Sequence, residues 1–352
     1  MPRAAVVLVT SALASLPALG RAAALRDNLF AVTANGPEVA WAVGNFGSIH
    51  VTKDGGQTWQ TRPSNTKQPL FSIDFGDERR GWIVGKSGLI LRTTDGGETW
   101  QAQQNPIVPA KHFFTVEAID GDTAWAVGDW GAIVQTQDGG ATWKDRSLGA
   151  LAVERTESPD RMMQTMTDDV ILYDVHFIDS QHGFIVGEFG TLLATNDGGE
   201  HWRQLTLPTD KTMFAVHFRS PEDGWVVGID GIILHTTDGG ATWTTQNGLI
   251  ETGAIDDVSF VQAMANPGLY AVSVEGRRGI VVGDSGAFFV SDDGGQTWTR
   301  HSLPEAHRLT WVRDAVVTPA GRAFLVGAAG FTAATDGATV TLPDESRQAH
   351  VP

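Results

Sequence analysis

The chain has 352 residues, a formal net charge of −16 at pH 7 and no cysteine. The acidic charge argues against a nucleic-acid partner, because a negative surface does not release the counterions of a polyanion. The lack of cysteine excludes disulfides, cysteine metal sites, cysteine nucleophiles and thiol-linked lipid anchors. Abundant Gly (41) and Trp (12) and only 19% charged residues are typical of many short strands joined by tight turns, not of disorder.

Residues 1–24 are typical of a secretory signal peptide. Arg3 forms a short basic start, residues 4–19 are small or apolar, and three alanines at 22–24 form a cleavage site. We therefore expect an exported mature chain that begins near Leu25. An uncleaved membrane anchor is the alternative, but Thr10 and Ser15 interrupt the apolar run and Arg21 ends it. The mature chain is thus predicted to contain no transmembrane span.

One motif recurs seven times along the chain. It reads G-x-x-G, a short apolar run and then T-x-D-G-G-x-T-W, and it follows an A/G-W-x-V segment. The copies begin at Ala40, Gly81, Ala124, Gly183, Gly224, Gly279 and Ala323. The first motif glycine precedes the aspartate by ten residues in the first six copies, but by nine from Gly327 to Asp336, and Val340 replaces the last tryptophan. This self-similarity indicates a repeat architecture.

Each repeat is predicted to contain four strands, A to D. Strand A is an alternating segment such as residues 70–75, strand B is the A/G-W-x-V-G segment, strand C follows G-x-x-G, and strand D begins at T-W. Four-stranded antiparallel units repeated around an axis form a β-propeller with short, protected edges. We predict an all-β, seven-bladed propeller as a single domain over residues 25–345, followed by a tail over 346–352.

The ring is predicted to close without exchange of terminal strands. Blade one begins with its own strand near residues 29–32, and blade seven ends near residues 338–342. Closure would then depend on packing between blades one and seven. The degenerate last copy of the motif predicts that this seam is the weakest one.

The T-x-D-G-G-x-T-W segment is an Asp-box, also called a BNR repeat, and suits a hairpin turn between strands C and D. Its aspartate can accept hydrogen bonds from the following backbone, glycine allows positive φ, and the threonine hydroxyl can close the turn. The tryptophan is predicted to fill space between blades, which explains its abundance without a sugar site. The predicted structural residues are Asp54, Trp59, Asp95, Trp100, Asp138, Trp143, Asp197, Trp202, Asp238, Trp243, Asp293, Trp298 and Asp336.

The two faces of the predicted propeller carry different loops. The D–A and B–C loops share one face, and the A–B loops share the other with the Asp-boxes. We expect function on the first face, because loops on a rigid scaffold carry binding residues; plain solvated turns are the alternative. The candidate binding residues there are Phe46, Lys86, Asp129, Trp130, Glu188, Phe189, Asp230 and Asp284, of which Phe46, Trp130 and Phe189 suggest an aromatic patch.

Two insertions interrupt the regular spacing. The D–A segment from about Arg146 to Asp169 adds the candidates Arg155 and Arg161 beside three methionines, which suits adaptable protein contacts or a plain surface loop. In blade six the strand A position aligns with Ser259, 24 residues before Gly283. This alignment predicts extra residues between strands A and B, and it places Tyr270 on the Asp-box face.

Polar residues recur on the predicted inner strands, which line the axial channel. His176 and His217 suggest a metal or catalytic cluster, but polar walls of a water-filled channel explain the same residues, and no short-range ligand spacing favours a metal. We therefore assign no catalytic residue, metal or cofactor. The polar positions are Asp74, Glu117, Asp174, His176, His217, Asp257 and Asp314.

These signals together, from about Asn28 to Pro343, resemble the photosystem II assembly/stability factor family of cyanobacteria and chloroplasts. The resemblance implies a non-enzymatic propeller in the periplasm or thylakoid lumen that binds a membrane-protein assembly intermediate, in photosynthetic members the reaction-centre precursor. It also implies an arginine-rich surface patch. This chain departs from that pattern, since only Lys86 is basic among its G-x-x-G loops. Similar sequences occur in bacteria without photosynthesis, so the resemblance leaves the organism's photosynthesis open.

Two other functions stay open at this point. An accessory subunit of another membrane complex, such as a transporter, would share the scaffold and differ only in its partner. A sialidase-like glycoside hydrolase would need a tyrosine nucleophile, a carboxylate and an arginine cluster. The chain has only Tyr173 and Tyr270, and Tyr173 has no evident arginine cluster nearby. The sequence therefore favours a monomeric, protein-binding scaffold over an enzyme.

Overall fold

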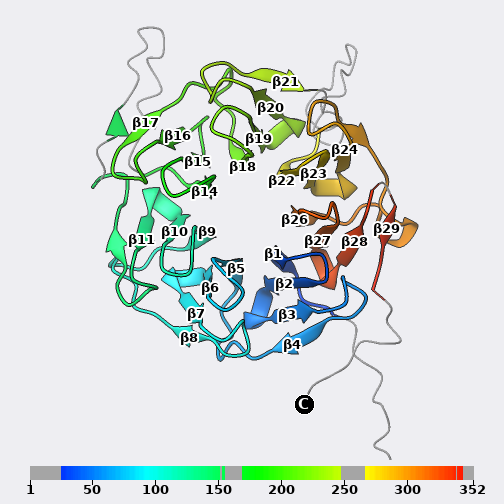
Figure 1. The fold of residues 1–352 in the computed structure, drawn as a ribbon, viewed down its shortest axis with the longest axis horizontal. Coiled ribbons are helices and arrows are strands. Elements are labelled where there is room, and N and C mark those ends of the chain that lie inside the picture. The colour runs from blue at the N-terminus through cyan, green and yellow to red at the C-terminus, as the bar shows by residue number, and fades with distance from the viewer. Residues whose placement is uncertain (1–24, 151–152, 155–168, 247–265, 338, 344–352) are drawn as a thin grey trace, which may run out of the picture.

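The computed structural model describes residues 25–150, 153–154, 169–246, 266–337 and 339–343. Seven antiparallel sheets surround a central axis, and four consecutive strands form the body of each (Figure 1). The predicted seven-bladed all-β propeller is therefore confirmed. In the described part of the chain, no helix is long and apolar enough to cross a membrane.

The strands of each blade run from the axis to the rim in the order A, B, C and D. The first three blades are β1 (Leu29–Asn35), β2 (Val39–Gly44), β3 (Ile49–Thr52) and β4 (Gln60–Arg62); β5 (Leu70–Phe75), β6 (Gly81–Gly85), β7 (Ile90–Thr93) and β8 (Gln101–Ala102); β9 (Phe113–Ala118), β10 (Ala124–Gly128), β11 (Ile133–Thr136) and β12 (Lys144–Asp145). Blades four and five are β14 (Leu172–Phe177), β15 (Gly183–Gly187), β16 (Leu192–Thr195) and β17 (Trp202–Gln204); β18 (Met213–Phe218), β19 (Gly224–Gly228), β20 (Ile233–Thr236) and β21 (Thr244–Gln246). Blades six and seven are β22 (Leu269–Glu275), β23 (Arg278–Gly283), β24 (Phe288–Ser291) and β25 (Thr299–Arg300); β26 (Val312–Val317), β27 (Ala323–Gly327), β28 (Thr332–Thr335) and β29 (Val340–Thr341).

Blade four carries one additional strand. β13 (Val153–Glu154) pairs in parallel with β17 at the outer edge of the sheet, so part of the insertion between blades three and four extends this blade. Arg155 and Arg161 lie outside the described residues, as do residues 1–24 and 346–352.

The prediction for blade six was wrong. Strand A is β22, and it pairs directly with β23, with Ser273 opposite Ile280. The extra residues therefore precede strand A and join blades five and six, and both Ser259 and Asp257 lie outside the described residues. Residues 255–260 and 269–275 alternate equally well, so local pattern could not choose between them. Pairing with β23 identifies residues 269–275 as strand A of blade six.

The Asp-box turns repeat one set of hydrogen bonds. In blade one the Asp54 carboxylate accepts bonds from the Thr58 N–H (2.9 Å), the Thr58 hydroxyl (2.6 Å) and the Thr52 hydroxyl (2.8 Å). The Gly55 N–H also donates to the Glu38 carbonyl of the A–B turn at 2.9 Å. The same glycine bond recurs in blades two to six, so in six blades the box ties the C–D turn to the A–B turn, on the face predicted for both.

The seventh turn is built differently. The Thr335 hydroxyl donates to the Thr339 carbonyl at 2.7 Å, and the exposed Asp336 carboxylate lies 3.9 Å from Arg322 Nε. Asp336 thus ends in an ion pair at the surface, whereas the aspartates of the other boxes hold their own turns.

Each box tryptophan packs against the preceding blade. Trp143 of blade three shares a buried cluster with Trp82 and Val84 of blade two. The second box glycine lies against the same neighbour: a Cβ on Gly97 would come within 2.5 Å of the Trp41 ring. Glycine is required there by both the close approach and a φ of +85°.

This direction of packing corrects the prediction about the weakest seam. Trp59 of blade one packs on Phe324 and Val326 of blade seven, so the closing seam keeps its tryptophan. The degenerate box lies instead at the seam of blades six and seven, where Val340 packs in place of a tryptophan. Closure follows the predicted mode, because the four strands of both terminal blades are each continuous in sequence.

The inner strands are joined by side chains. Neighbouring A strands run side by side without forming one sheet, and a polar side chain bridges every gap to the next strand. In circular order the bridges are Asp314 to Val32 N–H (2.8 Å), Thr33 to Asp74 (3.1 Å), Ser72 to Val116 N–H (3.2 Å), Glu117 to Phe177 N–H (3.3 Å), Asp174 to Val216 N–H (2.9 Å), His217 to the Val274 carbonyl (2.8 Å) and Ser273 to Val317 N–H (3.0 Å). The polar column thus holds the blades together, beyond providing polar walls.

We predict that Trp143→Ala lowers the free energy of unfolding by about 3–5 kcal/mol, the usual cost of emptying a large aromatic site. Trp143 is 7% exposed, and its Nε1 donates to Gln103 Oε1 at 3.0 Å. Trp130→Ala in the same blade is the matched control, because Trp130 is 58% exposed and should change stability by no more than about 0.5 kcal/mol. Denaturant unfolding of both variants measures the difference. Equal losses would refute the assigned packing role.

We predict that the stability difference between the wild type and Asp314→Asn depends on pH. Burial raises the pKa of Asp314 from 3.8 to about 6, although the Val32 and Ala315 N–H groups lower it in part. A raised carboxyl pKa gives stability that is present below about pH 4 and lost as the pH rises through about 6. Asparagine does not titrate, so the melting midpoint of the variant should rise relative to that of the wild type as the pH increases from about 4 to about 6.

The control for this experiment is Asp336→Asn, because the Asp336 side chain is 78% exposed. Because a substitution at an exposed surface position changes stability by no more than about 0.5 kcal/mol, its difference from the wild type should be small throughout the same pH interval. A difference for Asp314→Asn that is equally flat from pH 4 to about 7 would contradict the assigned pKa.

Candidate functional site

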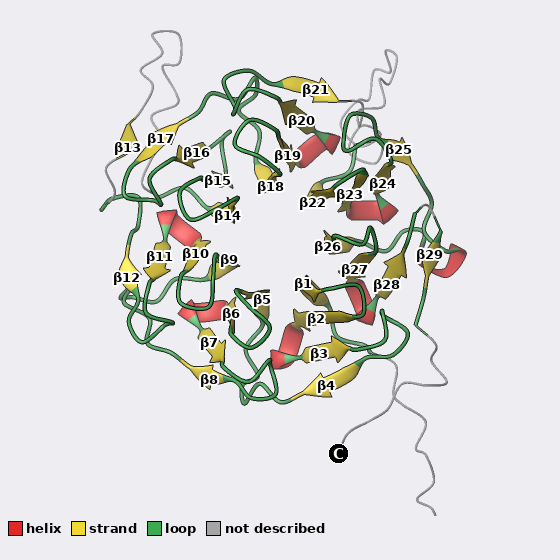
Figure 2. Cartoon of the chain, in the orientation of Figure 1, coloured by secondary structure: helices red, strands yellow, loops and turns green. Residues whose placement is uncertain are grey.

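The G-x-x-G loops lie on the face opposite the Asp-boxes, with the D–A connections. The Gly131 N–H, for example, donates to the carbonyl of Val170 in the segment before β14. The second variable residue of each loop has positive φ, from 52° to 61°, although none is glycine. In six blades the loop forms a short 3₁₀ turn, drawn as red segments in Figure 2: η1 (Asn45–Gly47), η2 (Lys86–Gly88), η3 (Asp129–Gly131), η4 (Ile229–Gly231), η5 (Asp284–Gly286) and η7 (Ala328–Gly330).

The three predicted aromatic contact residues project from this face. Phe46, Trp130 and Phe189 are 71%, 58% and 67% exposed. They stand on the loops of blades one, three and four, and no contact between their rings occurs in the described chain. The structure therefore places them on one face as separate projections and does not assemble them into a continuous patch.

The acidic candidates are engaged within their own blades. Asp129 lies 3.2 Å from His112 Nδ1, Glu188 accepts the Ile171 N–H at 3.1 Å, and Asp230 pairs with Lys211. Asp284 accepts the Tyr270 hydroxyl at 2.7 Å, whereas Lys86 is exposed. Most of these carboxylates therefore position local backbone or side chains.

A second group of residues on this face was missed by the sequence analysis. The second residue of every A strand is skipped by the ladder to strand B, which is the signature of a β-bulge. Bulges re-aim side chains and are frequent next to functional sites. Six of the seven skipped residues are aromatic, and we call them with Arg313 the channel-mouth ring: Phe30, Phe71, Phe114, Tyr173, Phe214, Tyr270 and Arg313.

The aromatic members of the channel-mouth ring contact one another in sequence. Centroids of adjacent rings are 5.1–5.9 Å apart, within the range that aromatic pairs favour. The ring lies at the G-x-x-G end of the channel. In each blade the residue before the ring member pairs with the last residue of strand B, which is the first glycine of G-x-x-G, as Leu29 does with Gly44. Figure 1 shows the A strands, such as β1, β14 and β26, nearest the axis.

Arg313 occupies the blade-seven position of the ring. Its guanidinium carbon lies 4.7 Å from the centroid of Tyr270, which is a cation–π contact. On the other side, Trp311 stacks on Phe30 with ring centroids 6.3 Å apart. The side chains of blade seven thus close the circle that the aromatic residues of the other blades leave open.

The channel-mouth ring encloses a cavity of about 120 Å³. Asp174 and Asp314 line it just inside the ring, where burial raises the pKa of Asp174 to about 7. Asp174 also accepts hydrogen bonds from the Val175 and Val216 N–H groups, at 3.0 and 2.9 Å. The site is therefore an aromatic mouth over a floor of carboxylates that already serve the blade seams.

His176 and His217 lie deeper in the channel, with ring centroids 4.9 Å apart. Burial lowers the pKa of His176, but its hydrogen bond and attraction to Glu117 outweigh this and raise it to about 9. Burial and the charge of His176 lower the pKa of His217 to about 3. Both ring nitrogens of His176 have partners, the Glu117 carboxylate (3.3 Å) and the Phe218 carbonyl (2.9 Å), and His217 contacts the Val274 carbonyl, so both histidines join neighbouring blades.

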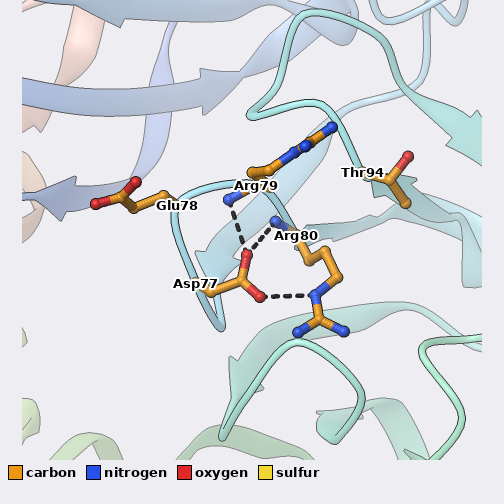
Figure 3. A pocket seen from close by; sticks show the side chains of 5 residues that line it. All are labelled: Asp77, Glu78, Arg79, Arg80 and Thr94. Atoms are coloured by element: carbon orange, nitrogen blue, oxygen red, sulfur yellow. Dashed lines mark hydrogen bonds and ion pairs between the residues drawn. The ribbon is translucent and has the colours of Figure 1, made fainter.

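Another recess lies beside the A–B turn of blade two (Figure 3) and has a volume of about 540 Å³. Two of its charged side chains are paired: Asp77 accepts the Arg79 backbone N–H (2.8 Å) and Arg80 Nε (2.6 Å), and Arg80 also pairs with Asp122 at 2.7 Å. The Glu78 and Arg79 side chains also line this open recess, and no hydrogen bond or ion pair in the described structure joins them to another residue.

The predicted position of Tyr270 was wrong. Because β22 follows the insertion, Tyr270 belongs to the channel-mouth ring and not to the Asp-box face. Burial and the hydrogen bond to Asp284 raise its pKa above the ordinary value, which makes it a weaker nucleophile. Tyr173 is also in the ring, and burial raises its pKa as well.

Comparison with solved structures supports the fold. The chain is similar to a structure described as "YCF48 bound to D1 peptide", with 20% identity, a TM-score of 0.64 and coverage of 88% of this chain and 93% of that one. It is also similar to a GH74 xyloglucanase from Xanthomonas campestris, with 13% identity, a TM-score of 0.66 and coverage of 93% of this chain but 54% of the enzyme. At these identities the likeness shows the propeller fold alone.

Comparison with protein sequences identifies the family. A curated relative, "Photosystem II assembly lipoprotein Ycf48" of Nostoc sp. (strain PCC 7120), is 38% identical over 61 residues, which cover 17% of this chain and 18% of that protein. The family model described as "Photosynthesis system II assembly factor YCF48" matches residues 19–158, 152–247 and 200–330, most of the chain. With its seven Asp-box blades, the chain belongs to the Ycf48 family of photosystem II assembly factors.

Proposed function

We propose that this protein is an exported, non-enzymatic scaffold that binds a segment of a membrane protein during assembly. The observation that carries the proposal is the channel-mouth ring, a half-buried aromatic surface on the face that also bears Phe46, Trp130 and Phe189. Exposed aromatic side chains on a rigid frame favour protein contacts, because they bury large area at low entropic cost. Membership of the Ycf48 family and the D1 peptide named for one solved relative support the choice of partner.

The rigidity of the frame supports a binding role as well. The seam bridges and box tryptophans fix the seven A strands, so the ring and the loops are held in place before a partner arrives. A preorganised surface loses less conformational entropy on binding than a flexible one. The chain acts in this proposal as a monomer in the periplasm or thylakoid lumen.

The hydrolase alternative has one observation in its favour, since Tyr270, Asp284 and Arg313 lie together at the mouth. The same contacts weaken it. The raised pKa of Tyr270 opposes nucleophilic attack, and Arg313 is the only cation among the described residues that line the cavity, where such enzymes use a cluster. We therefore propose binding without turnover.

We predict that overlapping peptides from the lumenal segments of D1 bind the mature chain and that Trp130→Ala combined with Phe189→Ala weakens binding at least tenfold. The loss follows from the exposed contact area that both side chains provide on the binding face. Fluorescence anisotropy of labelled peptides gives the dissociation constants. Gln57→Ala, an exposed residue of the blade-one Asp-box, is the control on the other face and should leave binding unchanged.

If none of the D1 peptides binds, the photosystem partner is wrong, and a different membrane complex captured from solubilised membranes becomes the better assignment. Release of sugar from a glycoside panel by the purified chain would contradict the non-enzymatic role.

A further inference from the structure

The guanidinium of Arg313 is the least satisfied charge in the channel mouth. Within the described chain it takes part in no hydrogen bond or ion pair, and its contact is the face of Tyr270. Arginine on an aromatic face keeps the edge of its guanidinium available, and that edge matches the two oxygens of a carboxylate. Arg313 is also half-buried, so an anion bound there would be partly removed from water.

The carboxylates near Arg313 are occupied elsewhere. Asp314 accepts the Val32 and Ala315 N–H groups at 2.8 Å each, and Asp284 accepts the Tyr270 hydroxyl at 2.7 Å. None of them lies within ion-pair distance of Arg313 in the described structure. Arg313 therefore faces the cavity without an ion pair or hydrogen bond in the described structure, although its charge offsets part of the rise that burial causes in the pKa of the neighbouring Asp314.

The cavity beside Arg313 has room for one side chain of about the size of leucine. Its volume is about 120 Å³, and a dry protein cavity of roughly 150 Å³ is large enough for benzene. Aromatic rings wall it on the sides next to the arginine. An apolar group and a carboxylate would thus be held in the same layer of the channel, because all members of the channel-mouth ring occupy equivalent strand positions.

A peptide C-terminus places these two groups together. Its last residue carries the side chain and the carboxylate on one Cα, whereas in an extended internal segment neighbouring side chains point to opposite sides. We propose that the channel mouth captures the free C-terminus of a partner polypeptide, with its terminal carboxylate on Arg313 and a leucine-sized terminal side chain in the cavity. This assignment rests on the proposed binding function and specifies how the partner is held.

The net charge of the chain does not oppose this assignment at short range. The formal charge of −16 acts over the whole surface, and at physiological ionic strength it is screened beyond about 8 Å. Backbone capture of a C-terminal carboxylate is a common mode of peptide recognition, and here a side chain takes the role of the donor.

The test uses the mature chain and three labelled octapeptides of Gly and Ser that end in leucine acid, leucine amide or lysine amide. Fluorescence anisotropy should show that the leucine acid binds at least tenfold more tightly than the leucine amide. Arg313→Gln should abolish this preference, and Arg313→Lys should retain part of it, since lysine keeps the charge but not the fork. Arg308→Gln is the matched control, because Arg308 is 63% exposed and pairs with Glu305.

Equal binding of leucine acid and leucine amide to the wild type would overturn the proposal. A preference that survives in Arg313→Gln, with an unchanged melting midpoint, would overturn it as well. Tighter binding of the lysine amide would make the mouth a cation site instead. If D1 segments bind equally well as acids and as amides, this inference is contradicted and the proposed function is kept. If the leucine acid binds but no D1 segment does, the photosystem partner of the proposed function is contradicted and this inference is kept.

Discussion

The structure depends on the contact between each Asp-box and the blade before it. The second box glycine and the box tryptophan pack against the preceding blade, as Gly97 and Trp100 do against Trp41 of its strand B. This contact repeats with one direction around the ring. Because Trp59 meets blade seven in the same way, the circle closes without exchange of terminal strands. This packing fixes the positions of the inner strands and therefore of the channel-mouth ring.

Hydrogen bonds near the axis join neighbouring blades, as the box tryptophans do nearer the rim. A propeller blade twists, so neighbouring A strands cannot pair as a sheet, and their backbone groups need other partners. Asp314, Asp174 and Ser273 supply them across the gaps. Acidic side chains that face a channel, such as Asp174 and Asp314, resemble catalytic groups. Their raised pKa values instead record burial within the seams.

The functional face follows from a small local irregularity. Each A strand begins with a bulge, and the bulge turns one side chain toward the axis. Aromatic residues fill this position in six blades, and Arg313 fills it in the seventh. The proposed binding of a polypeptide segment rests on this rigid frame, on the aromatic wall of the channel mouth and on the guanidinium of Arg313. The family of the chain is consistent with that role.

The sequence by itself determined the number of blades, the strands within them and the two faces, because the ten-residue spacing and the Asp-box chemistry are local. It also marked Trp130 and Phe189 as surface residues. Only the tertiary structure decided where strand A of blade six lies, which seam holds the degenerate box and that the channel-mouth ring exists. Residues 30, 71, 114, 173, 214, 270 and 313 are far apart in the sequence, and their common direction comes from strand pairing. Local alternation cannot report a bulge, because a bulge exists only relative to the neighbouring strand.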